Sequence, residues 1–219
     1  MTCTLSIDTC IGSGSAVLYK DDVRLAAANS LRDAGRETNA LVLIEQIVRL
    51  TNLGFKDIDE FVVTRGPGSF TGVRTGLSIV RGFLRSGTYG FRSCTTMQAL
   101  TVAAGDGPVQ CATLINAGRK ELAVQEFERD QGEQTFVEKG PHKVIFDSDL
   151  VTGFARSEKL ILVAEAGLSE RLSVSPLEII FAGSGIADLA YEFVGRAEGS
   201  KGLGYIDAIY TRDFIGGKS

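Results

Sequence analysis

The sequence contains a single histidine, His142, in a polar stretch. A zinc protease needs two histidines one helical turn apart, and a Ser-His-Asp triad needs a histidine with a supporting motif, so both classes are excluded. Cysteine is also scarce, and no Cys-x-x-Cys spacing indicates a metal site, a redox motif or a disulfide framework. The four cysteines are Cys3, Cys10, Cys94 and Cys111. Most of them lie in or beside apolar runs, where a small buried thiol is the usual role.

Long apolar runs are missing as well. No segment approaches the ~20 apolar residues of a membrane-spanning helix, and the first residues lack the pattern of a secretory signal. We therefore expect a cytoplasmic protein that makes no membrane contact. The formal charge of −4 and the pI of about 5.2 disfavour direct binding of a phosphate backbone. With 219 residues, of which 44% are hydrophobic, the chain can bury a full core in one large or two small domains.

The most informative segment that is present is a glycine-rich corner, Arg65–Arg74, which reads RGPGSFTGVR. An apolar strand at Phe61–Thr64 is expected to enter it, and Thr71 is expected to cap a helix over Gly72–Arg85. Such a corner favours an anion, because free helix N–H groups and the helix dipole point at it. The residues for phosphoryl chemistry are absent. Val73 follows the last glycine where a P-loop has lysine, and the glycine spacing is G-x-G-x-x-x-G instead of G-x-G-x-x-G.

The predicted elements divide the chain into two units. Strands at Thr4–Ile7, Ala16–Tyr19 and Val23–Ala28 and a helix at Glu37–Leu53 precede the corner, and a short strand near Tyr89–Phe91 and a helix at Met97–Ala104 follow it. The turn cluster Gly105–Pro108 marks the boundary. Beyond it we expect strands at Val109–Ile115, Glu121–Glu128, Thr135–Val137, Leu160–Val163 and Ile179–Ala182, and a helix at Ile186–Val194. We predict domains at 1–104 and 105–202, with residues 203–219 returning to the first domain.

The corner resembles the signature of a bacterial family, the TsaB (YeaZ) proteins, which typically read GRGPGSFTG(V/L)R-x-G, and the likeness runs from Arg65 to Gly76. Three further segments resemble family landmarks in the expected order: Leu5–Thr9, Ile115–Glu121 and Ala208–Arg212. The resemblance implies an α/β chain with the actin-like (ASKHA, ribonuclease H-like) fold, in two domains whose mixed sheets are flanked by helices. It also implies a non-catalytic subunit that supports TsaD in making N6-threonylcarbamoyladenosine on tRNA.

Four residues, Asp8, Thr9, Ser13 and Gly14, resemble the first phosphate loop of that fold, where an aspartate holds a magnesium shell. Taken alone, they are a strand-end aspartate and a polar hairpin turn. Active members of the fold place a second carboxylate in the matching turn of the second domain, where this chain has Asn116. A neutral amide is no general base and binds magnesium poorly. We therefore predict a vestigial phosphate loop and no catalytic residue, metal or cofactor of the chain's own, with ATP and metal on the partner subunit or at the shared interface.

The adenosine site expected of the fold is also incomplete. The family has a G-x-G-like turn after a strand of the second domain, but Leu160–Val163 is followed by Ala164-Glu165-Ala166-Gly167, which lacks the first glycine. The segment Gly183-Ser184-Gly185 is an alternative turn, although we favour a simpler role in which Ser184 caps the next helix.

The helix after Thr71 is predicted to contact a partner, because its small residues leave a flat strip and the preceding helix is apolar on more than one side. In TsaB relatives these two helices contact TsaD, or a second copy of the chain when TsaD is absent. The predicted interface residues are Arg36, Leu41, Glu45, Gly72, Arg74, Thr75, Gly76, Ser78 and Arg81. The alternative is that the small residues fit the helix to its own sheet.

Three functions remain in competition. The first is a scaffold subunit that binds TsaD, reaches TsaE through the complex and meets tRNA only indirectly. The second is an actin-like ATPase or kinase with an unusual second phosphate loop. The third is a homodimeric binding domain whose corner holds a small anion. Asn116 favours the scaffold over the enzyme, and the length of the Arg65–Gly76 match favours this family over a generic module.

Overall fold

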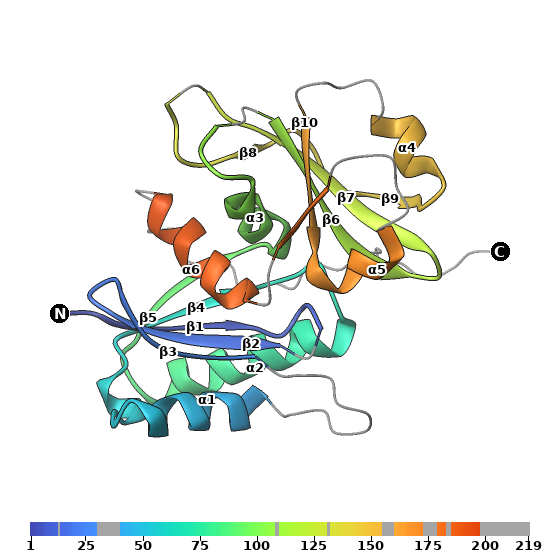
Figure 1. Cartoon of the computed structure of the whole chain (residues 1–219). Coiled ribbons are helices and arrows are strands. Elements are labelled where there is room, and N and C mark those ends of the chain that lie inside the picture. The colour runs from blue at the N-terminus through green and yellow to red at the C-terminus, as the bar shows by residue number, and fades with distance from the viewer. Residues whose placement is uncertain are drawn as a thin grey trace.

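The computed structural model describes residues 1–12, 14–29, 40–107, 110–130, 132–154, 160–172, 179–182 and 185–197. Within them the chain forms a five-stranded sheet and a six-stranded sheet, with helices between the sheets and on their outer faces (Figure 1). This is the α/β architecture of two mixed sheets that the sequence predicts. None of the described helices has the length and apolar character needed to cross a membrane.

The first sheet has the strand order β3-β2-β1-β4-β5. Its strands are β1 (Cys3–Asp8), β2 (Ser15–Lys20), β3 (Val23–Asn29), β4 (Glu60–Thr64) and β5 (Gly90–Cys94). The first three strands form an antiparallel meander, and β4 and β5 continue the sheet in parallel from β1. The predicted strands at the start of the chain are thus confirmed.

Helices α1 (Ala40–Leu50) and α2 (Phe70–Ser86) cover the outer face of the first sheet (Figure 1). Each is amphipathic, so that a stripe of apolar side chains at helical spacing meets the apolar side chains of the strands. Ile44 and Ile47 of α1 and Val73 and Val80 of α2 share one buried cluster with Phe61 of β4. This packing fixes α2 against the side chains of β1 and β4.

The second sheet has the order β11-β10-β6-β7-β8, with β9 also paired to β7. Its strands are β6 (Gln110–Gly118), β7 (Glu121–Glu128), β8 (Val137–Glu138), β9 (Lys143–Phe146), β10 (Leu160–Glu165) and β11 (Ile179–Ala182). Its outer face carries α4 (Asp149–Phe154), the short 3-10 helix η3 (Ala166–Leu168) and α5 (Ser169–Leu172). The sequence did not predict β9, α4 or α5, because each is too short to show a clear period.

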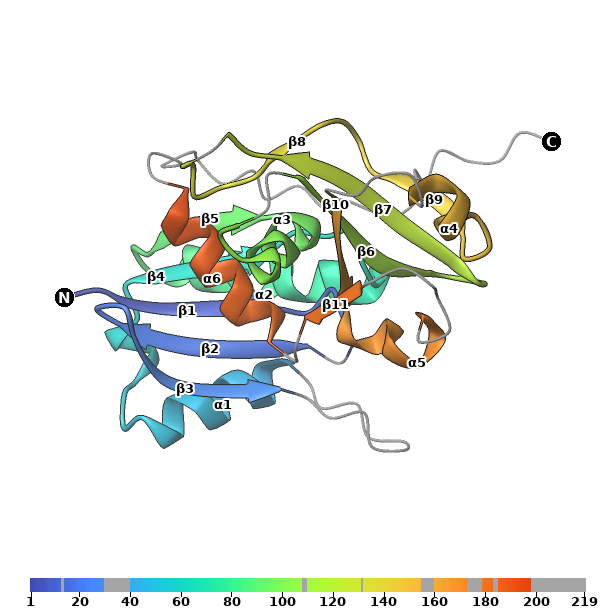
Figure 2. The ribbon, with the colours of Figure 1, turned by 45° about the horizontal axis from the view of Figure 1, so that its top comes forward.

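Between the sheets lie α3 (Thr96–Thr101), which continues into a 3-10 turn (Val102–Ala104), and α6 (Ile186–Arg196) (Figure 2). Val62 of β4, Phe127 of β7, Leu100 of α3 and Phe193 of α6 belong to one buried cluster, so both sheets share this core. Although α6 follows the second sheet in sequence, the Ser6 hydroxyl of β1 donates to the carbonyl of Ala187 at 2.7 Å. The domain limits at 104/105 stay a prediction.

Several predicted helix ends need correction. Helix α2 begins at Phe70, and its cap is Ser69, whose Oγ accepts from the amide of Gly72 at 3.3 Å, so Thr71 is not the cap. Helix α1 ends at Leu50, before the predicted Leu53, where Asn52 turns the backbone into the left-handed region at a φ of 55°. Residues 37–39, the proposed cap Ser184 and the tail 203–219 lie outside the described residues.

Candidate functional site

Asp8, at the end of β1, is fully enclosed. Its side chain is 1% exposed, and its carboxylate accepts three hydrogen bonds, from the Thr64 hydroxyl at 2.5 Å and from the amides of Cys10 at 3.1 Å and Ile11 at 3.3 Å. Burial raises the pKa of Asp8, because the low-dielectric interior disfavours the charged form, and the hydrogen bonds oppose that rise only in part. The oxygen atoms of Asp8 are therefore engaged by donors of the same chain.

The glycines of α2 are packed against the loop that follows β1. A Cβ on Gly76 would lie 2.5 Å from the Thr9 hydroxyl, and one on Gly72 would overlap the carbonyl oxygen of Thr9. The same hydroxyl donates to the carbonyl of Gly72 at 2.6 Å. The expectation that Gly72 and Gly76 offer an open strip to another helix is wrong, since both face Thr9. These two glycines fit α2 to the loop after β1 and, at Gly76, to Val63 of β4, as the alternative proposed, whereas Ser78 of the predicted strip is exposed.

The rest of the corner continues this packing. A Cβ on Gly68 would lie 2.8 Å from the Cβ of Cys10, and the amide of Ser69 donates to the carbonyl of Cys10 at 2.8 Å. Gly14 stands at a φ of +96°, and a Cβ there would approach the carbonyl oxygen of Asp8 to 2.9 Å, so glycine is required. The loop after β1 and the glycine-rich corner are thus in close backbone contact. Ser13 lies outside the described residues.

The second loop holds an arginine that the sequence did not single out. Arg171, on α5, donates from Nη1 to the side-chain oxygen of Asn116 at 2.8 Å and from Nη2 to the carbonyl of Glu121 at 2.9 Å. It also forms an ion pair with the carboxylate of Asp147. The guanidinium therefore neutralises Asp147 and holds the Asn116 side chain beside it. No local motif marks Arg171, because it stands 55 residues beyond Asn116.

A second buried acid, Glu165, ends β10. It is 5% exposed, and its Oε1 accepts from the amide of Asn116 at 2.7 Å. Burial raises the pKa of Glu165, and the negative charge of Asp8 adds to the rise. Each half of the chain thus holds a buried carboxyl, although the second one comes from β10 and not from the turn after β6. Within the described residues, no group of three or more histidine, cysteine, aspartate or glutamate side chains could hold a metal ion.

The outer surface of α1 and α2 carries most of the other predicted interface residues. Leu41 is 49% exposed, and Glu45 is exposed and paired with Arg49 at 2.7 Å. Arg74 stacks over the Phe70 ring at 3.8 Å from its centroid. Ser78 and Arg81 are also exposed and Thr75 is half-buried, whereas Arg36 lies outside the described residues. The role of these residues in partner binding stays a prediction.

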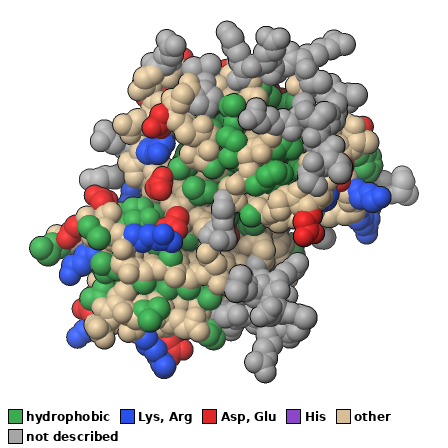
Figure 3. Space-filling view, viewed as in Figure 1, with side chains coloured by type: hydrophobic (Ala, Val, Ile, Leu, Met, Phe, Trp, Pro, Cys, Tyr) green, Lys and Arg blue, Asp and Glu red, His purple; other side chains and the backbone are tan. Residues whose placement is uncertain are grey.

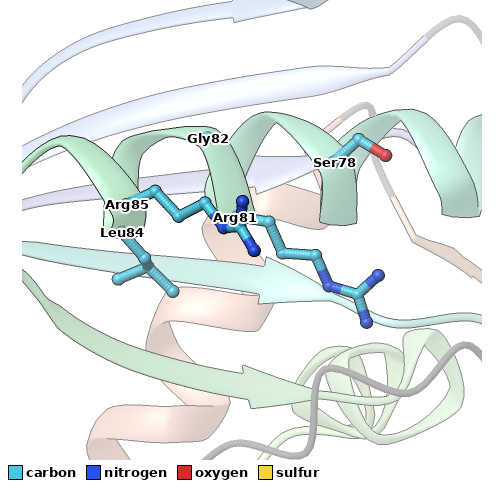
Figure 4. Close-up of a pocket in the computed structure, with 5 residues that line it drawn as sticks. All are labelled: Ser78, Arg81, Gly82, Leu84 and Arg85. Carbon is cyan, nitrogen blue, oxygen red and sulfur yellow. The ribbon is translucent and has the colours of Figure 1, made fainter.

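A hollow of about 560 Å³ runs along α2 (Figure 4). It is lined by Ser78, Arg81, Gly82, Leu84 and Arg85. Elsewhere, basic and acidic side chains are interspersed over the visible face in Figure 3. The charge of that face is thus mixed, which does not favour a broad nucleic-acid surface there.

Comparison with known sequences agrees with this architecture. The family model of TsaD, tRNA N6-adenosine threonylcarbamoyltransferase, matches residues 34–186. The chain is 28% identical over 138 residues to the tRNA threonylcarbamoyladenosine biosynthesis protein TsaB of Escherichia coli K12, which covers 60% of this chain and 59% of that protein. It is 35% identical over 79 residues to the Haemophilus influenzae protein of the same name, and this match covers 36% of this chain and 33% of that protein. The matches thus span 59% or less of these relatives.

Comparison with solved structures extends over nearly the whole chain. YeaZ from Pseudomonas aeruginosa superimposes with a TM-score of 0.70 at 17% identity, covering 96% of this chain and all of that one. A second P. aeruginosa structure, an uncharacterized protein with similarity to peptidase YEAZ, superimposes with a TM-score of 0.68 at 19% identity. This match covers 97% of this chain and 100% of that one. At such identities the likeness establishes the fold, which is the predicted actin-like ASKHA fold. The family model shows that the chain belongs to the TsaD family, and the two sequence relatives agree with the predicted resemblance to its TsaB (YeaZ) members.

Proposed function

We propose that this chain is a non-catalytic partner subunit that supports a TsaD subunit in forming N6-threonylcarbamoyladenosine on tRNA. The observation that carries the proposal is the enclosure of Asp8. A carboxylate that organises magnesium must present oxygen atoms to the ion, as hard cations require. In this chain Asp8 is 1% exposed and accepts hydrogen bonds from Thr64, Cys10 and Ile11. The first phosphate loop therefore acts as a packing element.

The second loop supports the same function. Where a second metal-organising acid is expected, Asn116 accepts from Arg171, whose positive charge also pairs with Asp147. A metal ion placed beside this guanidinium would experience charge repulsion. ATP and metal therefore belong to the partner subunit or to the shared interface.

The partner surface in this proposal is the outer side of α1 and α2. Three exposed apolar side chains project from α1, namely Leu41, Val42 and Leu50, and Phe70 projects from the start of α2. Surplus apolar area beside charged residues is typical of protein interfaces. TsaD would bind here, TsaE would join through the complex, tRNA would be met indirectly, and a second copy would occupy the surface when TsaD is absent.

The competing function, an ATPase or kinase, is favoured by one observation, which is that each half of the chain holds a buried carboxyl, Asp8 and Glu165. Reconstituted tRNA modification decides between the two. With TsaD and TsaE of the same organism, omission of this chain should abolish modification. Asp8→Asn, which keeps the shape of the side chain, should support the wild-type rate, because Asp8 performs no chemistry.

The matched measurement is calorimetry of the isolated chain with magnesium and ATP, where we expect weak binding or none. Tight magnesium-dependent binding, combined with loss of modification in a folded Asp8→Asn variant that still binds TsaD, would instead establish the enzyme. Full modification without the chain would reject a supporting role altogether.

A further inference from the structure

The charge of α2 differs in sign from that of the whole chain. Its 17 residues include Arg74, Arg81 and Arg85 and no aspartate or glutamate, whereas the chain as a whole carries −4. By contrast, α1 balances its exposed Glu45 with Arg49. The positive charge of this part of the surface is therefore concentrated on one helix.

The arginines also share one side of α2. Positions 74, 78, 81 and 85 follow steps of four, three and four residues, which places them in one row along a helix. Arg74, Ser78, Arg81 and Arg85 are all exposed. We call this row the arginine face. In Figure 4, Arg81 and Arg85 extend over the same side of α2, beside the hollow that Leu84 also lines.

We propose that the arginine face recognises an acidic surface of the TsaD subunit and that its charge selects this partner over a second copy of the chain. The inference rests on the function proposed above. Complementary charge raises the association rate and rejects partners of like sign. In an isologous dimer whose two-fold axis crosses the arginine face, the arginine faces of the two copies would lie next to each other, so like charges would approach. An acidic helix or loop on TsaD would meet no such repulsion.

The same features make nucleic acid the less favoured occupant. Non-specific binding of a single strand needs aromatic rings open to bases. Of the two aromatic side chains of α2, Phe83 stacks on Phe61 in the core, and one face of the Phe70 ring is taken by Arg74. The hollow also has an apolar wall, Leu84, and a bare backbone at Gly82, where a Cβ would meet no heavy atom within 4 Å. A close-fitting protein segment matches this shape.

The test compares binding to TsaD with self-association as salt rises from about 0.1 M to about 1 M, over which the Debye length falls from about 10 Å to about 3 Å. Affinity for TsaD should fall by on the order of tenfold, because screening removes the attraction. Self-association should strengthen over the same range, because screening removes a repulsion. This opposite response of the two complexes is the expected signature.

Arg85→Glu provides the matched variant. At low salt it should weaken TsaD binding about as much as high salt does, whereas Arg85→Lys should bind like wild type. Lys143→Glu, on exposed β9 of the second sheet, changes the net charge equally and should have no effect. Thermal melting should confirm that each variant is folded.

Three results would overturn the inference. If wild type and Arg85→Glu bind TsaD equally and without salt dependence, TsaD binding is not electrostatic at this face, although the proposed function stands. If Arg85→Glu abolishes tRNA binding by the isolated chain and leaves TsaD binding unchanged, the face is a nucleic-acid site. If the wild-type chain does not bind TsaD at any salt concentration, the proposed function fails as well.

Discussion

At the scale of single residues, Gly76 and Gly82 show how the same residue type serves opposite roles on one helix. Gly76 is buried, and a Cβ there would lie 2.5 Å from the Thr9 hydroxyl. Gly82 is exposed, and a Cβ there would meet no heavy atom within 4 Å. The first glycine is required by packing, whereas the second costs helix stability and contributes no contact.

Alanine substitution at the two positions should therefore have opposite effects. Gly76→Ala overpacks the contact with Thr9 and should destabilise the monomer by ~1–3 kcal/mol. Gly82→Ala should stabilise it by ~0.4–1 kcal/mol, because the unfolded chain loses freedom and the helix gains propensity. Urea titration of dilute protein measures both. A Gly76→Ala variant that is as stable as wild type but fails to bind TsaD would return Gly76 to the interface.

These residues also mark the limit of what the sequence could predict about the site. The motif Arg65–Gly76 identified the family and the phosphate corner, but small residues look alike in sequence whether they face a partner or their own sheet. Glu165 appeared only as part of a turn with a missing glycine, because only the fold buries its side chain and pairs it with the amide of Asn116. Arg171 carried no signal, since its partners Asn116, Glu121 and Asp147 are all distant in the chain.

At the scale of elements, α5 is a four-residue helix that is held in place by two of its side chains, Arg171 and Leu172. Arg171 connects it to the carbonyl of Glu121 in β7, to Asn116 in β6 and to Asp147 after β9. A helix this short has almost no stability of its own. Its place on the sheet therefore depends on these bonds and on Leu172, which is 5% exposed.

Arg171→Met should keep much of the side-chain volume and remove the three connections. We expect a loss of ~1–3 kcal/mol, the usual effect of leaving partly buried polar groups unpaired. Hydrogen exchange should rise in β6, β7 and α5 more than in the first sheet. Arg119→Met, in the exposed turn between β6 and β7, is the control and should change little. Equal exchange in both variants would mean that α5 is held by packing alone.

Predictability at this scale followed element length and period. The strands of the meander and the long amphipathic helices α1, α2 and α6 were predicted from alternation or helical spacing. The two-residue β8 was placed only approximately, and β9, with exposed Val144 and Phe146 beside half-buried Ile145, is an edge strand whose apolar residues face both ways. Helix ends were less certain, because Ser69 and Thr71 are both good caps and only the fold selects one.

At the scale of the whole molecule, α6 fastens the second half of the chain to the first sheet. Tyr191 of α6 stacks on Tyr19 of β2, with ring centroids 3.7 Å apart and planes 5° apart. The Tyr19 hydroxyl donates to Asp188 at 2.9 Å, and the Tyr191 hydroxyl donates to Asp22 at 2.7 Å. Arg24 of β3 also pairs with Asp188 at 2.8 Å.

Removal of the Tyr191 ring should weaken the contact between α6 and the first sheet, because both the stack on Tyr19 and the hydrogen bond to Asp22 are lost. Tyr191→Ala should destabilise the protein by less than the roughly 3–5 kcal/mol that a fully buried aromatic costs, because the Tyr191 ring is half-buried. Tyr191→Phe keeps the stack and loses one exposed hydrogen bond, so it should cost at most about 1 kcal/mol. Differential scanning calorimetry measures both. Wild-type melting of Tyr191→Ala would mean that the stack holds nothing together.

The position of α6 also constrains the order in which a nascent chain can fold. The bond between Ser6 and Ala187 joins residues 181 positions apart, and the amide of Ala187 donates to Ser15 at 3.0 Å. Such distant contacts slow folding, because a long loop must close before they form. During synthesis, β1 and β2 must wait with one face open until α6 has emerged from the ribosome. The inner face of the first sheet is therefore the surface that chaperones would have to protect longest.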